Sequence, residues 1–214
     1  FWGSADYPPL LAMLPDAPAM LAVQGDAALL SQMPSFAIVG ARNASAAGRR
    51  IAEDIAEALT KAGVLVISGL ARGVDAAAHQ GALRAGPTLA VLPGGLDVAY
   101  PPENAALQSR IGREGALVAE HALGTAPLAR HFPKRNRIVA GLSLGVLVVE
   151  AAERSGTLIT ARLALEAGRE VFAIPGSPLD PRSRGANDLI RQGAHLVESA
   201  ADVLAHLPEA HRDG

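Results

Sequence analysis

Beginning at Phe36, short apolar runs alternate with segments of helical spacing, and several of the runs end at or next to a glycine. The runs lie at 36–39, 64–67, 88–92, 116–119, 146–149, 171–174 and 195–197, and the helical segments at 45–61, 74–83, 103–113, 157–167 and 186–192. Strands that are apolar on both faces are typical of parallel sheets covered by helices on each side. We therefore predict an α/β fold with a doubly wound, mostly parallel sheet and helices on both faces.

The amino-acid composition limits the kind of core the protein can have and argues against membrane proteins and disulfide-bonded proteins. Half of the 214 residues are apolar but only 3% are aromatic, so the core must consist mainly of Ala, Val, Leu and Ile. No run approaches the roughly 18 apolar residues of a membrane span, and we expect no membrane association. The absence of cysteine excludes disulfides and thiolate metal sites, and it is compatible with the cytoplasm, where we place the protein.

The ends of the chain differ from its middle. Residues 1–34 carry repeated prolines and little periodicity, which predicts an irregular lead-in with a short helix at 10–14. The alternating pattern predicts one domain at 35–207. The polar residues 208–214 are expected to form a frayed tail.

One segment concentrates positive charge in a chain whose formal net charge is −2. Arg130, Lys134, Arg135 and Arg137 surround Phe132 just before an apolar helical run. Cations at the start of a helix oppose the helix dipole, at a cost of about a few tenths of a kcal/mol each, unless an anion binds there. Stacking of a base on an aromatic ring contributes about 1–3 kcal/mol. A site for phosphate and one base is therefore favoured over a solvated helix start.

The turn at 40–48 joins the first strand to the first long helix, at the sheet edge where open α/β folds bind ligands. The amides of 40–43 would bind an anion with help from Arg42, and Ser45 would cap the helix. The match to G-x-G-x-x-G is imperfect because Arg42 replaces the second glycine, and Ser68 stands where a ribose-binding acid would follow the second strand. We expect no dinucleotide cofactor. A plain turn with a solvated arginine is the alternative.

Further turns of this kind follow other strands. Ser155, Gly156 and Thr157 precede the helix at 157–167, where capping explains these residue types as well as ligand contact does. Several such turns at one edge would form a composite site. Asp75 and His79 stand four residues apart, which favours a pair within one helix over a metal site, since no third ligand is near. We predict no metal.

An enzymatic alternative comes from the turn at 93–95, Pro-Gly-Gly, which resembles in part the nucleoside-monophosphate phosphoribohydrolases. The residues that follow lack the Gly-Thr pair and the catalytic glutamate of that motif. The acids near strand ends that could act as a general base are Asp97, Glu120 and Glu150. A nucleotide-hydrolysing enzyme is thus the alternative function, and an oligomerisation module whose glycine turns serve only packing is a third.

The motifs form an ordered series: IVGAR at 38–42, SGLARGVDAAAH at 68–79, LPGGLD at 92–97, HFPKRNRIVAGLS at 131–143, RSGTLITA at 154–161, IPGSP at 174–178 and GANDLIRQGA at 185–194. This series resembles the DNA processing protein A (DprA/Smf) family of natural transformation, over roughly residues 8–200. In that resemblance, the Gly-Ser/Ala-Arg turn of the family corresponds to Gly40, Ala41 and Arg42, and its basic segment to 130–137.

The resemblance implies an extended Rossmann-like domain that binds single-stranded DNA without strong sequence preference. It also implies a homodimer that protects incoming DNA and helps load a RecA-type recombinase onto it, without catalysis. Compared with longer family members, the resemblance implies that the chain lacks most of a small helical N-terminal domain and any winged-helix-like C-terminal domain. Residues 1–34 would then be a remnant of that N-terminal domain, or a linker from it.

We predict no catalytic residue. The predicted DNA contacts are Gly40, Ala41, Arg42, Asn43, Ser45, Arg130, Phe132, Lys134, Arg135, Asn136, Arg137, Ser155, Gly156 and Thr157.

Overall fold

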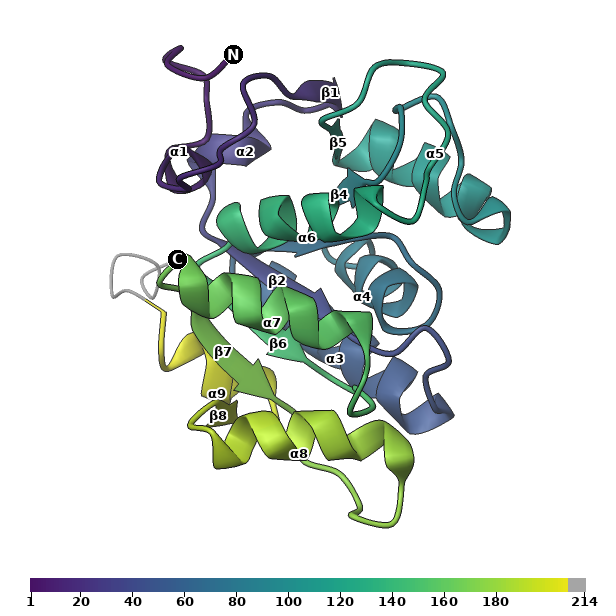
Figure 1. Ribbon diagram of the computed structural model, residues 1–214, viewed down its shortest axis with the longest axis vertical. Coiled ribbons are helices and arrows are strands. Elements are labelled where there is room, and N and C mark those ends of the chain that lie inside the picture. Colours follow the sequence, from purple (N-terminus) through teal and green to yellow (C-terminus); the bar gives the residue numbers. More distant parts are fainter. Residues whose placement is uncertain (208–214) are drawn as a thin grey trace.

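The computed structural model describes residues 1–207, which form one eight-stranded sheet covered by helices (Figure 1). The strands follow the order β1-β5-β4-β3-β2-β6-β7-β8. All neighbouring strands are parallel except β1 and β5, which are antiparallel. The strands are β1 Ala22–Gly25, β2 Ser35–Val39, β3 Leu65–Ser68, β4 Thr88–Leu92, β5 Ala116–Ala119, β6 Gly145–Val148, β7 Glu170–Ala173 and β8 His195–Leu196.

Helices cover both faces of this sheet. They are α1 Pro9–Ala12, α2 Leu29–Gln32, α3 Ala46–Lys61, α4 Val74–Ala82, α5 Ala105–Glu114, α6 His131–Gly141, α7 Gly156–Glu166, α8 Arg184–Arg191 and α9 Ala200–Leu204, with short 3-10 turns at Pro102–Asn104 and Pro181–Ser183. Ala37 and Val39 of β2 belong to the core that includes α6, α7 and α8, whereas Phe36 and Ile38 belong to the core that includes α3 and α4. The predicted mostly parallel, doubly wound sheet with helices on both faces is confirmed.

The predicted elements from 36 onward are present, with ends that differ by one to two residues in most cases. Ser45 caps α3 by accepting the Gly48 amide on its hydroxyl at 2.9 Å. The basic segment forms the first turns of α6, so its cations do stand at the start of a helix.

The prediction of an irregular lead-in at 1–34 is wrong in one respect. Strand β1 lies within this segment and pairs with β5 at the edge of the sheet (Figure 1). Its residues are mostly exposed, so the apolar alternation that reveals a strand is missing. The segment also packs on α6, because Leu11 and Leu14 fill the space beside Gly141. The expected helix is α1, which begins one residue earlier than predicted, and the predicted tail lies outside the described residues.

Candidate functional site

A cleft of about 590 Å³ opens where the chain leaves β2 and β6. These neighbouring strands lead into helices on opposite faces, α3 and α7, so their loops diverge at the carboxyl edge of the sheet. The first turns of α6 contribute to the same cleft. The predicted site residues that line it are Gly40, Ala41, Arg42, Asn43, Phe132, Arg135, Asn136, Ser155, Gly156 and Thr157.

Arg135 forms the buried floor of the cleft, with 6% of its surface exposed. Its guanidinium rests against Gly69, where a Cβ would lie 1.2 Å from Nη1 of Arg135. The same Nη1 lies 4.0 Å from Oδ2 of Asp75, and that oxygen accepts the Ala71 amide at 3.3 Å. Burial raises the pKa of Asp75 and lowers that of Arg135, while each charge opposes the shift of the other. The pair holds the turns at the base of the cleft together.

The predicted pair between Asp75 and His79 does not form. Instead, His79 Nδ1 lies 2.8 Å from Oγ1 of Thr88, whose hydroxyl donates to the Val66 carbonyl at 2.7 Å. Burial, aided by the charge of Arg135, lowers the pKa of His79 to about 3. The imidazole is therefore neutral and is part of the polar support beneath the cleft.

Phe132 lies in the cleft wall with its ring partly exposed and in contact with two guanidiniums. Cζ of Arg42 lies 5.0 Å from the ring centroid and Cζ of Arg135 lies 5.9 Å from it. Tyr100 meets the ring edge-on, with centroids 5.6 Å apart. Because a cation over a ring face is attracted to it, Phe132 orients Arg42. A base that stacks here would share the ring with that guanidinium.

Two backbone turns face the cleft with open amides. The Thr157 hydroxyl donates to the Gly40 carbonyl at 3.0 Å and links the two turns. Ser155 caps α7 by accepting the Thr157 amide at 3.2 Å. Within residues 1–207, the amides of Arg42 and Gly156 have no protein acceptor. Both are available to a phosphate oxygen.

Ser45 does not line the cleft, because its polar groups are already used. Its amide donates to Oε2 of Glu150 at 2.9 Å and its hydroxyl donates to Oε1 at 2.5 Å. Sequence reasoning considered Glu150 only as a possible general base. Ser45 therefore caps α3 and is held by a carboxylate, as capping alone would predict, and its contact with DNA stays a prediction.

Arg137 also lies elsewhere than predicted. Its Nε is 3.3 Å from Oδ2 of Asp16 and its Nη2 is 2.5 Å from Oε1 of Glu120, and only 13% of its side chain is exposed. Successive residues of an α-helix are about 100° apart, so Arg135 and Arg137 lie on nearly opposite faces of α6. Arg137 therefore connects α6 with the N-terminal segment and with Glu120, outside the cleft, and its phosphate contact stays a prediction.

Arg130 and Lys134 occupy exposed positions at the start of α6 without lining the cleft. Neither has an acidic partner within ion-pair distance in the part of the chain that is described. They add positive charge on the side of the cleft formed by α6.

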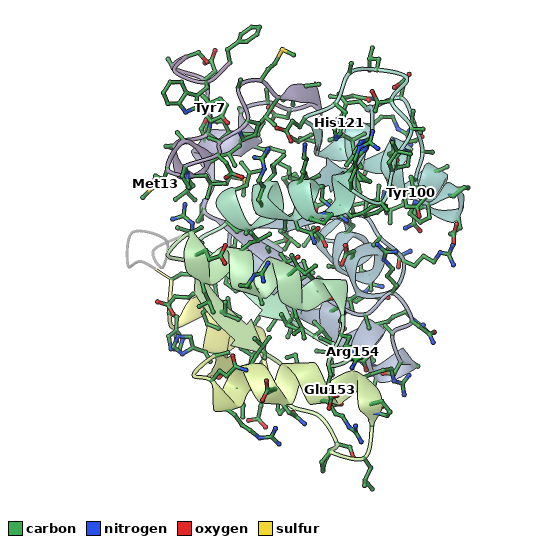
Figure 2. The ribbon with its side chains drawn as sticks, viewed as in Figure 1. Tyr7, Met13, Tyr100, His121, Glu153 and Arg154 are labelled. Atoms are coloured by element: carbon green, nitrogen blue, oxygen red, sulfur yellow. The ribbon has the colours of Figure 1, made fainter. Side chains whose placement is uncertain are left out.

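Two arginines that the sequence reasoning missed line the cleft, Arg154 and Arg182. Arg154 stands in the loop before α7, next to Glu153 (Figure 2). Among residues 1–207 it makes no ion pair, whereas Arg182 lies 2.8 Å from Asp180. The signal for Arg154 was its position immediately before the predicted Ser-Gly-Thr turn. Arg182 gave no local signal, because the fold alone brings it to this edge.

The acids considered as general bases have other contacts. Asp97 accepts the Gly124 amide at 2.8 and 3.0 Å. Glu120 and Glu150 are held in the ion pair and the helix cap described above. None of the three lines the cleft, and the Pro-Gly-Gly turn at 93–95 is buried. The arrangement gives the hydrolase alternative no positioned base among these acids.

Two structural features are absent from residues 1–207. No group of three or more His, Asp or Glu side chains lies close enough together to hold a metal ion. None of the helices combines the length and the apolar character needed to cross a membrane.

Comparison with known proteins gives consistent results along almost the whole chain. The family model of DNA recombination-mediator protein A matches residues 1–208. DNA processing protein DprA of Bacillus subtilis is 44% identical over 207 residues, which are 96% of this chain and 70% of that protein. The DprA of Streptococcus pneumoniae is 48% identical over 200 residues, or 93% of this chain and 70% of that protein.

Solved structures agree with the sequence comparison. The crystal structure of S. pneumoniae DprA has a TM-score of 0.92 and 47% identity, covering 96% of this chain and 72% of that one. DNA processing protein A from Helicobacter pylori, described for its single-stranded DNA binding mode, has a TM-score of 0.85 and 30% identity, covering 92% and 91%. A molybdenum cofactor binding protein of Rippkaea orientalis, with a TM-score of 0.59 and 19% identity, shares the fold alone.

Proposed function

This chain belongs to the DNA recombination-mediator protein A family, and we propose that it binds single-stranded DNA in the cleft between β2, β6 and α6, without sequence preference. The observation that carries the proposal is the combination of open backbone amides with unpaired guanidiniums at one sheet edge. Arg42 and Arg154 line this cleft, and neither makes an ion pair among the described residues. An unpaired cation beside open amides is suited to a phosphate.

In this proposal the strand is held by its backbone. Phosphates lie against Arg42, Arg154 and the start of α7, and Arg130 and Lys134 attract the strand from the rim. Phe132 supports one base together with the Arg42 guanidinium. Phosphate contacts do not distinguish between sequences, and stacking accepts every base, so the binding is sequence-independent.

We further propose that the protein binds the strand without altering it chemically. The acid that lines the cleft, Asp75, is buried and lies opposite Arg135, and the acids considered as general bases lie outside the cleft. These contacts favour a binding role over the nucleotide-hydrolase alternative. Incubation with nucleoside monophosphates should release no free base, and release of base would revive the alternative.

The binding proposal is tested with a fluorescent oligo-dT and a duplex of the same length, by anisotropy at two salt concentrations. We expect tighter binding of the single strand and a log-log salt slope of about −0.7 for each phosphate contact. Arg42→Ala should weaken binding equally for oligo-dT and oligo-dC. Arg113→Ala is the matched control, because this exposed arginine lies in the last turn of α5, at the opposite, amino edge of the sheet. Equal affinity of wild type and Arg42→Ala would place the DNA elsewhere.

The biological role that we propose is protection of incoming DNA in natural transformation and loading of a RecA-type recombinase, by a homodimer in the cytoplasm. The test is the rate at which the recombinase displaces a single-strand-binding protein from DNA with and without this chain. Light scattering of the purified chain measures its oligomeric state. An unchanged displacement rate would contradict the loading role, and a monomer would contradict the dimer.

A further inference from the structure

The start of α3 is where α/β folds of this class commonly bind a phosphate, because the helix follows the central strand β2 and presents free amides. In this chain Glu150 lies at that position. Its two carboxylate oxygens accept the Ser45 amide at 2.9 Å and the Ser45 hydroxyl at 2.5 Å. The carboxylate therefore occupies the amide and the hydroxyl of the N-cap residue, so neither group is open to a phosphate.

The first turn of α3 is shaped for this carboxylate. A Cβ on Gly48 would lie 2.6 Å from Cδ of Glu150 and 2.7 and 2.9 Å from its two oxygens. Only glycine leaves this space without a shift, so the helix backbone approaches the carboxylate directly. The start of α7 differs, because a Cβ on Gly156 would meet nothing within 4 Å. One of the two helix starts is filled by the chain itself and the other is open.

We propose that Glu150 determines specificity: its carboxylate substitutes for phosphate at the start of α3 and so excludes free mononucleotides and inorganic phosphate from that position. This inference rests on the proposed function of the cleft as a DNA site. A polynucleotide still binds, because it contacts Arg42, Arg154 and the start of α7 with several phosphates at once. A mononucleotide has one phosphate and loses the position that it occupies in related folds.

Glu150 is close enough to the cleft to influence a charged residue that lines it. Its neighbour Ala152 lines the cleft, as does Arg182. Hydrogen bonding to Asp180, and to a smaller extent the charge of Glu150, raises the pKa of Arg182. Glu150 therefore lies beside the cleft, at the position that a small anion would have to reach from it.

The test is a measurement of melting temperature with inorganic phosphate or thymidine 5′-monophosphate, each compared with chloride at equal ionic strength. The wild-type chain should show no rise beyond the chloride control. Glu150→Ala vacates the position, and both anions should then raise the melting temperature by roughly 3–5 °C at ten times their Kd. Glu150→Ser provides a second vacated variant, and a variant that folds only with phosphate present gives the same result in a stronger form.

Two control variants distinguish the effect of filling the position at the start of α3 from the effect of a negative charge near it. Glu150→Gln fills the same space without charge and should gain no phosphate response. Glu153→Ala removes an exposed carboxylate of the same loop, 3.6 Å from Arg184, and should also gain none. The proposal is overturned if wild type responds like Glu150→Ala, if neither vacated variant responds or folds with phosphate, or if Glu153→Ala responds equally. Oligo-dT binding of the same wild-type sample is scored separately, so that a failure of the DNA proposal is distinguishable from a failure of this one.

Discussion

Arg135 stands in the place of a side chain that Gly69 does not have. A Cβ on Gly69 would lie 1.2 Å from Nη1 of Arg135, in the floor of the cleft. The glycine that follows β3 thus serves the packing of an arginine contributed by α6.

Gly69→Ala should therefore displace the Arg135 guanidinium and destabilise the protein. Overpacking of this kind costs about 1–3 kcal/mol of unfolding free energy. Urea unfolding measures the loss, and anisotropy should show weaker oligo-dT binding because the floor of the cleft moves. Gly156→Ala is the stability control, since its Cβ meets no atom within 4 Å. Equal unfolding free energies for the two variants would contradict the packing role of Gly69.

Phe132→Leu should weaken binding of single strands by about 1–3 kcal/mol, or roughly 5- to 150-fold. The substitution keeps an apolar side chain but removes the ring face that orients Arg42 and supports a base. Phe132→Trp retains a face and should keep most of the affinity. Anisotropy with oligo-dT distinguishes the two, and an affinity for Phe132→Leu equal to that of wild type would refute a stacking role.

Arg137→Ala and Arg154→Ala should affect different properties: the first should lower stability and the second should weaken DNA binding. Loss of Arg137 leaves the partly buried Glu120 without its partner and should cost about 1–3 kcal/mol of stability, with little change in DNA affinity. Loss of Arg154 should leave stability unchanged and reduce the salt slope of DNA binding by about 0.7. Chemical unfolding and salt-dependent anisotropy of both variants provide the comparison. A weakening of DNA binding in Arg137→Ala alone would restore the prediction made from sequence.

The buried His79 should make the fold sensitive to acid. Its pKa is about 3 when folded and near 6.5 when unfolded, so between these values the unfolded chain binds the extra proton. Stability from this group is complete above pH 6.5 and is lost as the pH falls towards 3, by at most about 1.4 kcal/mol per pH unit. His79→Asn can keep the bond to Thr88 and should flatten this part of the stability curve. Identical curves for wild type and His79→Asn would exclude the effect.

The sheet and its order of helices were readable from sequence because each strand is a compact apolar run and each crossover is a regular helix. Strand β1 was not readable, because its exposed residues carry no alternation and because its pairing with β5 joins residues far apart in the chain, such as Ala22 and Ala119, which are 97 positions apart. Long-range pairing of this kind leaves no local signal.

The same limit applies to the site. The turns at Gly40 and Ser155 were predicted because glycine indicates a tight turn and a capping residue indicates the start of a helix, whatever the rest of the chain does. The position of Arg137 outside the cleft was not readable, because charge in a segment does not say which side of a helix each cation takes. Arg182 and the contact between Ser45 and Glu150 depend on side chains brought together only by the fold.

The hydrogen bond from Thr157 to the Gly40 carbonyl joins residues 117 positions apart in the chain. It connects the turn after β2 with the turn before α7 in the absence of any ligand. In the proposed binding mode, the encounter with DNA would then require no closing motion of these turns, and the conformational entropy lost on binding would be mainly that of the flexible DNA strand. Association should therefore proceed at a rate set by diffusion and charge, and variants of the cleft should differ from one another mainly in how fast the strand leaves.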